Sequence, residues 1–283
     1  MSRRARLLIT AICGIGTTIL AGAFLSFIEL RWGHALYSFT VWFVIPIGAL
    51  GAGMIAAVGY LIGARVANYR PSASFIGVIV ATSAAMFFLI QRMDYSFMAV
   101  DGNPIQEAVT FREFLAYTVV HMSLRIGVRS QLTGPGIEVG TAGYLFAGVQ
   151  IIGFVLGGLA IYGLISSMTY CDDCGLYLNS KGLQIRYFRS PEEMTAATST
   201  IQSEMRSRRL QHSVLIHGTS GTSTSTGALF SSRMALKSCK GCGKHWTEFT
   251  AHRRDKNDWK EITDLSLSAF SAEPVELHKT ISG

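Results

Sequence analysis

The sequence predicts a membrane α-protein: a bundle of four transmembrane helices with an outer amphipathic helix, followed by a small cytoplasmic α+β domain. Four long apolar segments occupy the first 168 residues. Four of the five cysteines form two Cys-x-x-Cys pairs after the last segment. Charge divides the chain in the same way, since residues 1–91 carry six arginines and one acid, whereas residues 168–283 carry 15 Lys or Arg and 12 Asp or Glu.

These observations set the predicted domain boundaries. We expect a membrane domain over residues 1–168 with an outer loop over 92–139, a cytoplasmic domain over 169–264 and a C-terminal tail over 265–283. Only 15% of the chain is charged, against about 25% in soluble domains. The net charge of +7 is explained by basic residues that flank membrane spans, so it does not require a nucleic-acid partner.

Each apolar segment is long enough to cross a bilayer, which takes about 20 residues. The first could instead be a signal peptide, but its apolar run is too long and no cleavage site follows it. No ionisable residue lies inside the expected spans, which argues against a proton-coupled transporter but leaves open a pore lined by Ser, Thr and glycine backbone. The expected spans are Leu7–Ile28, Leu36–Gly63, Ser72–Ile90 and Thr141–Met168.

The arginines that flank the spans predict the orientation. Short loops rich in Lys and Arg stay in the cytoplasm. This rule places the N-terminus, with three arginines in its first six residues, and the turn that holds Arg65 and Arg70 on the cytoplasmic side. Four crossings then return the C-terminus to the cytoplasm. We therefore expect a multi-pass protein of the inner (plasma) membrane with both termini cytoplasmic.

Small residues in the spans predict close helix packing in the lipid bilayer. Glycines recur four residues apart at Gly59 and Gly63, and again at Gly153 and Gly157. Such spacing lets helix backbones approach closely in lipid. We expect spans two and four to make close contacts, either within one chain or through self-association. Pro46 should kink span two because it lacks a backbone donor.

The outer loop contains a second helical pattern. Asn103-Pro104 reads as a helix start, and apolar residues then recur at helical spacing, which predicts an amphipathic helix over Pro104–Gly127. Its polar side carries Glu107, His121 and Arg125. These side chains form either a ligand or catalytic cluster or a solvated face, and we favour the solvated face because no nucleophile or carboxylate pair accompanies them.

The paired cysteines predict a metal site. Cys171 and Cys174 precede a glycine, as do Cys239 and Cys242. Four thiolates match the closed tetrahedral shell of structural zinc. A redox dithiol and an iron–sulfur cluster are the alternatives. A single redox pair does not explain two Cys-x-x-Cys turns, which we call knuckles. The predicted cytoplasmic location agrees, since thiols stay reduced there.

The knuckles and about 40 flanking residues resemble the zinc-ribbon family, in which two knuckles at β-hairpin tips hold one zinc. The resemblance implies that Cys171, Cys174, Cys239 and Cys242 are the ligands of one structural Zn²⁺. The gap between Cys174 and Cys239 is 64 residues, longer than in compact ribbons. An insertion with its own structure must therefore fill it.

The insertion shows one helix start and one linker. Ser190-Pro191 followed by two glutamates predicts a helix that continues to about Gln211. Residues 218–227 are all Gly, Ser or Thr and are typical of a flexible linker. Strands are expected over Ser232–Ser238 and Lys244–Thr250, with a further strand between Trp259 and Phe270. We expect the four histidines of this part to be solvated: His212, His217, His245 and His252.

These patterns predict a non-enzymatic protein, because nothing supplies a placed nucleophile or an open metal position. The expected function is to anchor a structural zinc module that binds a protein partner or supports an assembly. One alternative is a homo-oligomeric channel or transporter regulated by the zinc module, and another is a nucleic-acid sensor. The sequence identifies no small-molecule substrate.

Overall fold

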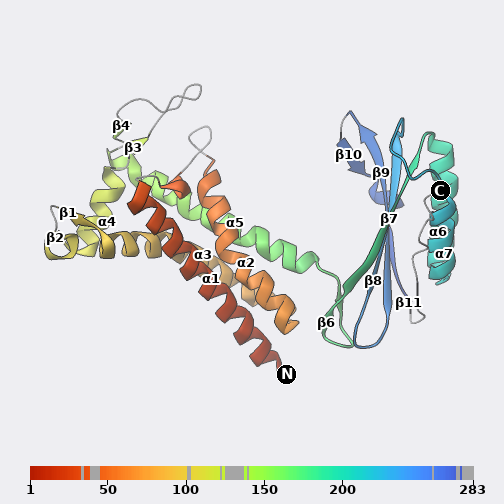
Figure 1. The fold of residues 1–283 in the computed structure, drawn as a ribbon, viewed down its shortest axis with the longest axis horizontal. Helices are drawn as coiled ribbons and strands as arrows, with labels where there is room; N and C mark the ends of the chain where they lie inside the picture. The colour runs from red at the N-terminus through yellow and green to blue at the C-terminus, as the bar shows by residue number, and fades with distance from the viewer. Residues whose placement is uncertain are drawn as a thin grey trace. The chain divides into compact units, whose positions relative to one another are not determined.

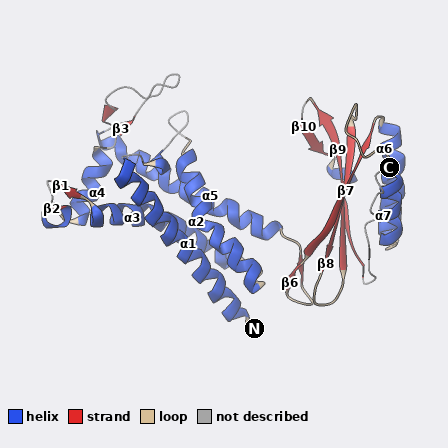
Figure 2. Ribbon diagram, viewed as in Figure 1, coloured by secondary structure: helices blue, strands red, loops and turns tan. Residues whose placement is uncertain are grey.

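The computed structural model describes residues 1–32, 35–38, 45–100, 103–121, 123–124, 137–138, 140–256, 258–271 and 275. The chain forms two compact units, Met1–Met168 and Thr169–Gly283. The first unit is mainly helical (Figure 1). The second combines a β-sheet with a layer of two helices (Figure 2).

Among the described residues, four helices of the first unit are long and apolar enough to cross a membrane; they match the four expected apolar segments and indicate a membrane protein. Large apolar side chains on their outer faces are exposed, as expected of helix surfaces that contact lipid. Leu145, for example, is 74% exposed. The four helices are α1 (Arg3–Trp32), α2 (Ile47–Ala67), α3 (Ala73–Phe97) and α5 (Gly143–Ser167).

The start of α2 corrects two predictions. The helix begins at Ile47 rather than near Leu36, and Leu36–Ser38 forms a short 3-10 helix, η1. Pro46 is the N-cap of α2, so the predicted kink within this span is wrong. Proline suits a helix start because the first N–H groups of a helix have no intrahelical acceptor.

Helices α1 and α3 extend beyond the spans predicted from hydropathy, and charged residues therefore lie inside them. Glu29 belongs to α1, while Arg92 and Asp94 belong to α3. Asp94 is only 4% exposed, so an acidic residue beyond the expected third span is buried within the same helix. The predicted boundaries stopped at the first charge, whereas a helix continues as long as its backbone hydrogen bonds are made.

The outer segment contains a shorter helix than the sequence predicted. Thr110 caps α4 (Phe111–Val120) through a reciprocal capping box: its hydroxyl accepts from the Glu113 N–H, and the Glu113 side chain accepts from the Thr110 N–H. This box, rather than Asn103-Pro104, starts the helix. The other elements here are β1 (Ala99–Val100), β2 (Asn103–Pro104), η2 (Ile105–Glu107), β3 (Ser123–Leu124), β4 (Ile137–Glu138) and η3 (Gly140–Ala142).

Glycine allows the spans to approach at their backbones. A Cβ added to Gly53 of α2 would clash with the backbone of Phe154 in α5, lying 2.8 Å from its Cα. Gly59 and Gly63 of α2 similarly face α1, where the Thr17 hydroxyl donates to the Ala56 carbonyl oxygen at 2.7 Å. The predicted contact between the second and fourth spans is thus present within one chain, and a comparable contact joins the first and second.

The second unit is an antiparallel sheet whose strands follow the order β10–β9–β8–β7, with β11 also paired to β9. Helices α6 and α7 cover one face of it (Figure 2). Met194, Ile201 and Val214 from the helices pack on Met234 and Phe249 from the sheet to form the core. The elements are β7 (Asn179–Phe188), α6 (Pro191–Arg206), α7 (Leu210–Thr219), β8 (Phe230–Ser238), β9 (His245–Asp255), β10 (Asp258–Glu261), η4 (Thr263–Leu265) and β11 (Leu267–Ser271).

Ser190 caps α6 as predicted, with its hydroxyl accepting from the Glu193 N–H at 3.2 Å. The helix does not continue to Gln211, because Arg208 adopts a positive φ of 60° and a new helix, α7, begins at Leu210. The first residues of the predicted flexible linker end α7, and Thr222 pairs with Tyr187 of β7. Residues 267–271, expected in the C-terminal tail, form β11.

His217 lies on the buried face of α7, and His252 of β9 is also buried, so the expectation that these two histidines are solvated is wrong. The His217 side chain is 0% exposed, and its ring lies 2.9 Å from the Ser232 hydroxyl and 3.1 Å from the Gln184 side-chain oxygen. Burial first, and the positive charge of Arg186 second, lower the pKa of His217 to about 4. His217 is therefore neutral in the folded unit at physiological pH.

Acid should destabilise the second unit through His217. In the unfolded chain the His217 imidazole is protonated below about pH 6.5. In the folded unit it is protonated only below about pH 4. The unfolded state therefore binds more protons in this window, so stability is complete above pH 6.5 and falls by about 3 kcal/mol towards pH 4. Pulse proteolysis in urea at stepped pH should show this fall.

His217→Gln should flatten that pH dependence, whereas His212→Gln should not. His212 lies at the surface, 3.0 Å from Glu204, with 54% of its side chain exposed. Equal pH dependence in the wild type and the His217→Gln variant would contradict the assignment.

Candidate metal centre

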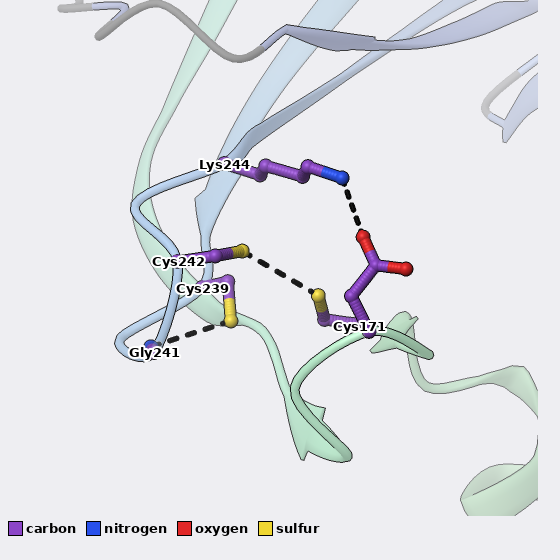
Figure 3. A network of polar contacts seen from close by, with 6 residues as sticks. Cys171, Cys239, Gly241, Cys242 and Lys244 are labelled. Atoms are coloured by element: carbon purple, nitrogen blue, oxygen red, sulfur yellow. Dashed lines mark hydrogen bonds and ion pairs between the residues drawn. The ribbon is translucent and has the colours of Figure 1, made fainter.

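Two β-hairpin tips carry the four predicted cysteine ligands. Cys171 and Cys174 lie on the hairpin of β5 (Tyr170–Cys171) and β6 (Leu176–Tyr177). Cys239 and Cys242 lie in the turn that joins β8 to β9. Figure 3 shows the cysteines of the two turns facing one another. The long insertion between the pairs is folded, as predicted, and its last strand leads directly into the second knuckle.

Glycine shapes both knuckles. Gly175 and Gly243, each directly after the second cysteine of a pair, have φ values of 63° and 71°. Residues other than glycine rarely adopt this backbone conformation. The turn at Cys239 also directs the Gly241 N–H at the Cys239 sulfur, 3.4 Å away (Figure 3). The second knuckle thus directs a backbone N–H group at a cysteine sulfur.

The sulfur positions fit a single tetrahedral metal ion. The ligand atoms of the four cysteines all lie within 4.8 Å of one another, and the Sγ atoms of Cys171 and Cys242 are 3.7 Å apart. Zinc–sulfur bonds of 2.3 Å in a tetrahedron place the sulfurs about 3.8 Å apart. All four cysteines are free thiols. The group can therefore hold a metal ion.

The two knuckles shift the pKa values of their cysteine thiols in opposite directions, as Cys239 and Cys174 show. Burial tends to raise the pKa of Cys239, but the N–H groups of Cys242 and Gly241 lower it to about 7. The pKa of Cys174 rises to about 12, through its contact with the Cys242 sulfur and through burial. Bringing four thiolates together therefore needs a cation to offset their repulsion.

Side chains around the sulfurs join the two hairpins. Leu176, Leu178 and Trp246 pack against the cysteines. Phe249 of β9 lies in the main core of the second unit with 0% exposure. Lys244 of the second knuckle forms an ion pair with Asp173 of the first, which lowers the pKa of the Asp173 carboxyl.

The polar side predicted for the outer helix is solvated at its described residues, because Glu107 and His121 are both exposed. Glu107 ends η2, and His121 follows α4, where its ring stacks on Tyr117 with centroids 3.9 Å apart. Arg125 lies outside the described residues. His121 thus has a local partner on its own helix.

Sequence reasoning missed two buried polar groups. Ser232, His217 and Gln184 form a hydrogen-bonded chain, but Ser232 is 1% exposed, so a substrate could not reach it. Glu29 and Asp94 meet between α1 and α3. The sequence does contain an indication of the Glu29–Asp94 group. Ser26 and Glu29 are three residues apart and therefore share one face of a helix.

A scan against known protein families matched no family model, and searches of curated proteins and of solved structures found no significant match. The fold and the site therefore define the chain only as a membrane protein that carries a tetracysteine group able to bind a metal ion.

Proposed function

We propose that the protein anchors a zinc-ribbon-like module to the inner membrane, and that this cytoplasmic module binds a partner protein or supports an assembly without catalysing a reaction. The observation that carries the proposal is the closed group of four cysteine sulfurs at two hairpin tips. Four thiolates complete a tetrahedral shell and leave no open position for a substrate. Such a site stabilises a fold.

Zinc is the proposed ion. A tetrahedral site of four sulfurs is typical of zinc or of iron–sulfur chemistry. The separation of the Cys171 and Cys242 sulfurs matches a single ion. Cys171, Cys174, Cys239 and Cys242 would hold it. The basic flanks of the spans place this module in the cytoplasm, where thiols remain reduced.

The proposed contact surface is the sheet face opposite α6 and α7, here called the open face. Strand register places on it aromatic and basic side chains of kinds that are enriched in protein interfaces. Leu183 and Phe270 on this face are 57% and 43% exposed. The open face includes Leu183, Tyr187, Arg233, Trp246, Arg254 and Phe270.

A photo-crosslinking residue in place of Leu183 should capture the partner in cells. The same residue in place of Ser199, exposed on α6, should not capture it. Arg233→Glu should abolish the Leu183 adduct if the open face is the binding site. Absence of an Arg233-dependent adduct, together with a dispensable module in growth assays, would count against the proposal.

A homo-oligomeric channel or transporter is the second candidate, because one observation favours it. Asp94 is buried in a span, and ionisable groups within spans often mark ion or substrate pathways. Reconstituted protein should then conduct ions or solute across liposomes, with Asp94→Asn reducing the flux. Tight liposomes under all ionic conditions would exclude this candidate.

A further inference from the structure

We propose that Glu29 and Asp94 form a binding site for a hard divalent cation between α1 and α3, with Ca²⁺ as its representative ligand. This site is independent of the function proposed above. Each helix contributes a pair of polar residues three positions apart: Ser26 and Glu29 from α1, and Gln91 and Asp94 from α3. That spacing puts both members of a pair on one helix face.

The two helices meet at Asp94. The Asp94 carboxylate is 4% exposed and accepts a hydrogen bond from the Ser26 hydroxyl at 2.5 Å. Glu29 lies close enough to interact with Asp94 and with Tyr37 of η1. The Tyr37 hydroxyl accepts a hydrogen bond from the Gln91 side-chain nitrogen at 2.9 Å. All five side chains therefore belong to one polar cluster.

Two oxygen atoms of this cluster are buried and lack a hydrogen-bond partner among the described residues: Glu29 Oε2 and Gln91 Oε1. Gln91 is 2% exposed, and its side-chain nitrogen donates to Tyr37, another member of the cluster. Within the described part of the chain, Lys and Arg form no ion pair with Glu29 or Asp94. A buried carboxylate beside a half-buried one, without a positive charge, is unfavourable, so the cluster needs a counter-charge.

A cation satisfies this cluster better than a shared proton does. A proton between the two carboxyl groups would reduce their repulsion but leave the Gln91 oxygen unpaired. A metal ion can accept both carboxylates and the amide oxygen together. The donors are all oxygen, which is the preference of Ca²⁺ and Mg²⁺, and two carboxylates balance a charge of +2.

The position of the cluster allows access from water. Glu29 lies three residues before the end of α1 at Trp32, and Asp94 lies three before the end of α3 at Phe97. Both carboxylates are therefore one helical turn from a span end, where the bilayer meets water. Ca²⁺ needs six to eight oxygen ligands, and water can complete the shell there.

Terbium luminescence tests the site in the full-length, zinc-loaded protein in an uncharged detergent. Tb³⁺ replaces Ca²⁺ at oxygen sites and emits when a nearby tyrosine such as Tyr37 is excited. We expect a saturable signal that Ca²⁺ displaces. Glu29→Gln and Asp94→Asn should each weaken binding at least tenfold, whereas Glu107→Gln, which neutralises an exposed carboxylate, should bind as the wild type does.

Thermal unfolding gives a second readout that needs no variant. At 100 times its Kd, Ca²⁺ should raise the ratio of folded to unfolded protein about 100-fold, and Glu29→Gln should abolish this response. Wild-type protein that shows no Ca²⁺ stabilisation and no saturable Tb³⁺ signal would overturn the proposal. Stabilisation by acid alone, without any response to Ca²⁺, would overturn it in favour of a shared proton.

Discussion

Cys239→Ser should reduce bound zinc from one ion per chain to near zero. Serine cannot supply a thiolate, and three remaining sulfurs leave the tetrahedral shell open. Zinc contributes about 10–16 kcal/mol of apparent binding free energy in small zinc domains, so the loss exceeds the stability of most domains. Metal analysis of the purified protein checks the stoichiometry.

The first knuckle should become sensitive to protease before the rest of the second unit. Among the residues that the structure describes, strands β5 and β6 pair only with each other, and β7–β11 form a separate sheet with its own core. The contacts of the first hairpin with the second knuckle centre on the cysteines. Limited proteolysis of Cys239→Ser should therefore begin near residues 169–178, with the membrane spans still inserted.

Cys13→Ser is the matched control. Cys13 lies in α1, so its loss should change neither zinc content nor the protease pattern. Retention of one tightly bound zinc by Cys239→Ser would refute the assignment of this cysteine as a ligand.

Gly53→Val should separate α2 from α5 and destabilise the membrane unit. A Cβ at this position would overlap the Phe154 backbone, and backbone cannot move aside as a flexible side chain can. Overpacking typically costs about 1–3 kcal/mol, and we expect the upper end because the added atoms meet a helix backbone. Unfolding in mixed micelles with a denaturing detergent measures the loss.

Gly51→Val separates packing from helix propensity. Gly51 lies in the same helix, and a Cβ there meets nothing within 4 Å. Its variant should unfold close to the wild-type midpoint. Similar losses at both positions would show that valine disturbs the helix itself, and the close contact would then have no special energetic role.

Hydropathy predicted the helices that are long and apolar enough to cross a membrane, and cysteine spacing predicted the group of four sulfurs. Each of these features depends on one dominant interaction, with lipid in the first case and with a metal ion in the second. A helix that crosses a bilayer needs about 20 apolar residues. Two Cys-x-x-Cys pairs have few structural roles other than binding a metal ion. Both predictions depend on local composition. The structure accordingly contains four candidate spans and one tetracysteine group.

The errors came from features that depend on tertiary partners. Pro46 is compatible with either a kink or a helix start, and only the position of the first backbone bond decides. Asp94 looks like a loop residue until Ser26 of another helix donates to it. Helix α7 escaped detection because its buried face includes Ser213 and His217, which no apolar pattern reveals.

Because 64 residues separate the two knuckles, the ribosome makes the second pair of cysteines some time after the first pair. Chains grow at about 5–20 residues per second, so the second pair of cysteines is made roughly 3–13 s after the first. During that interval Cys171 and Cys174 have no partner pair with which to enclose an ion. The proposed four-thiolate site therefore cannot close until β8 and the second pair of cysteines have emerged from the ribosome.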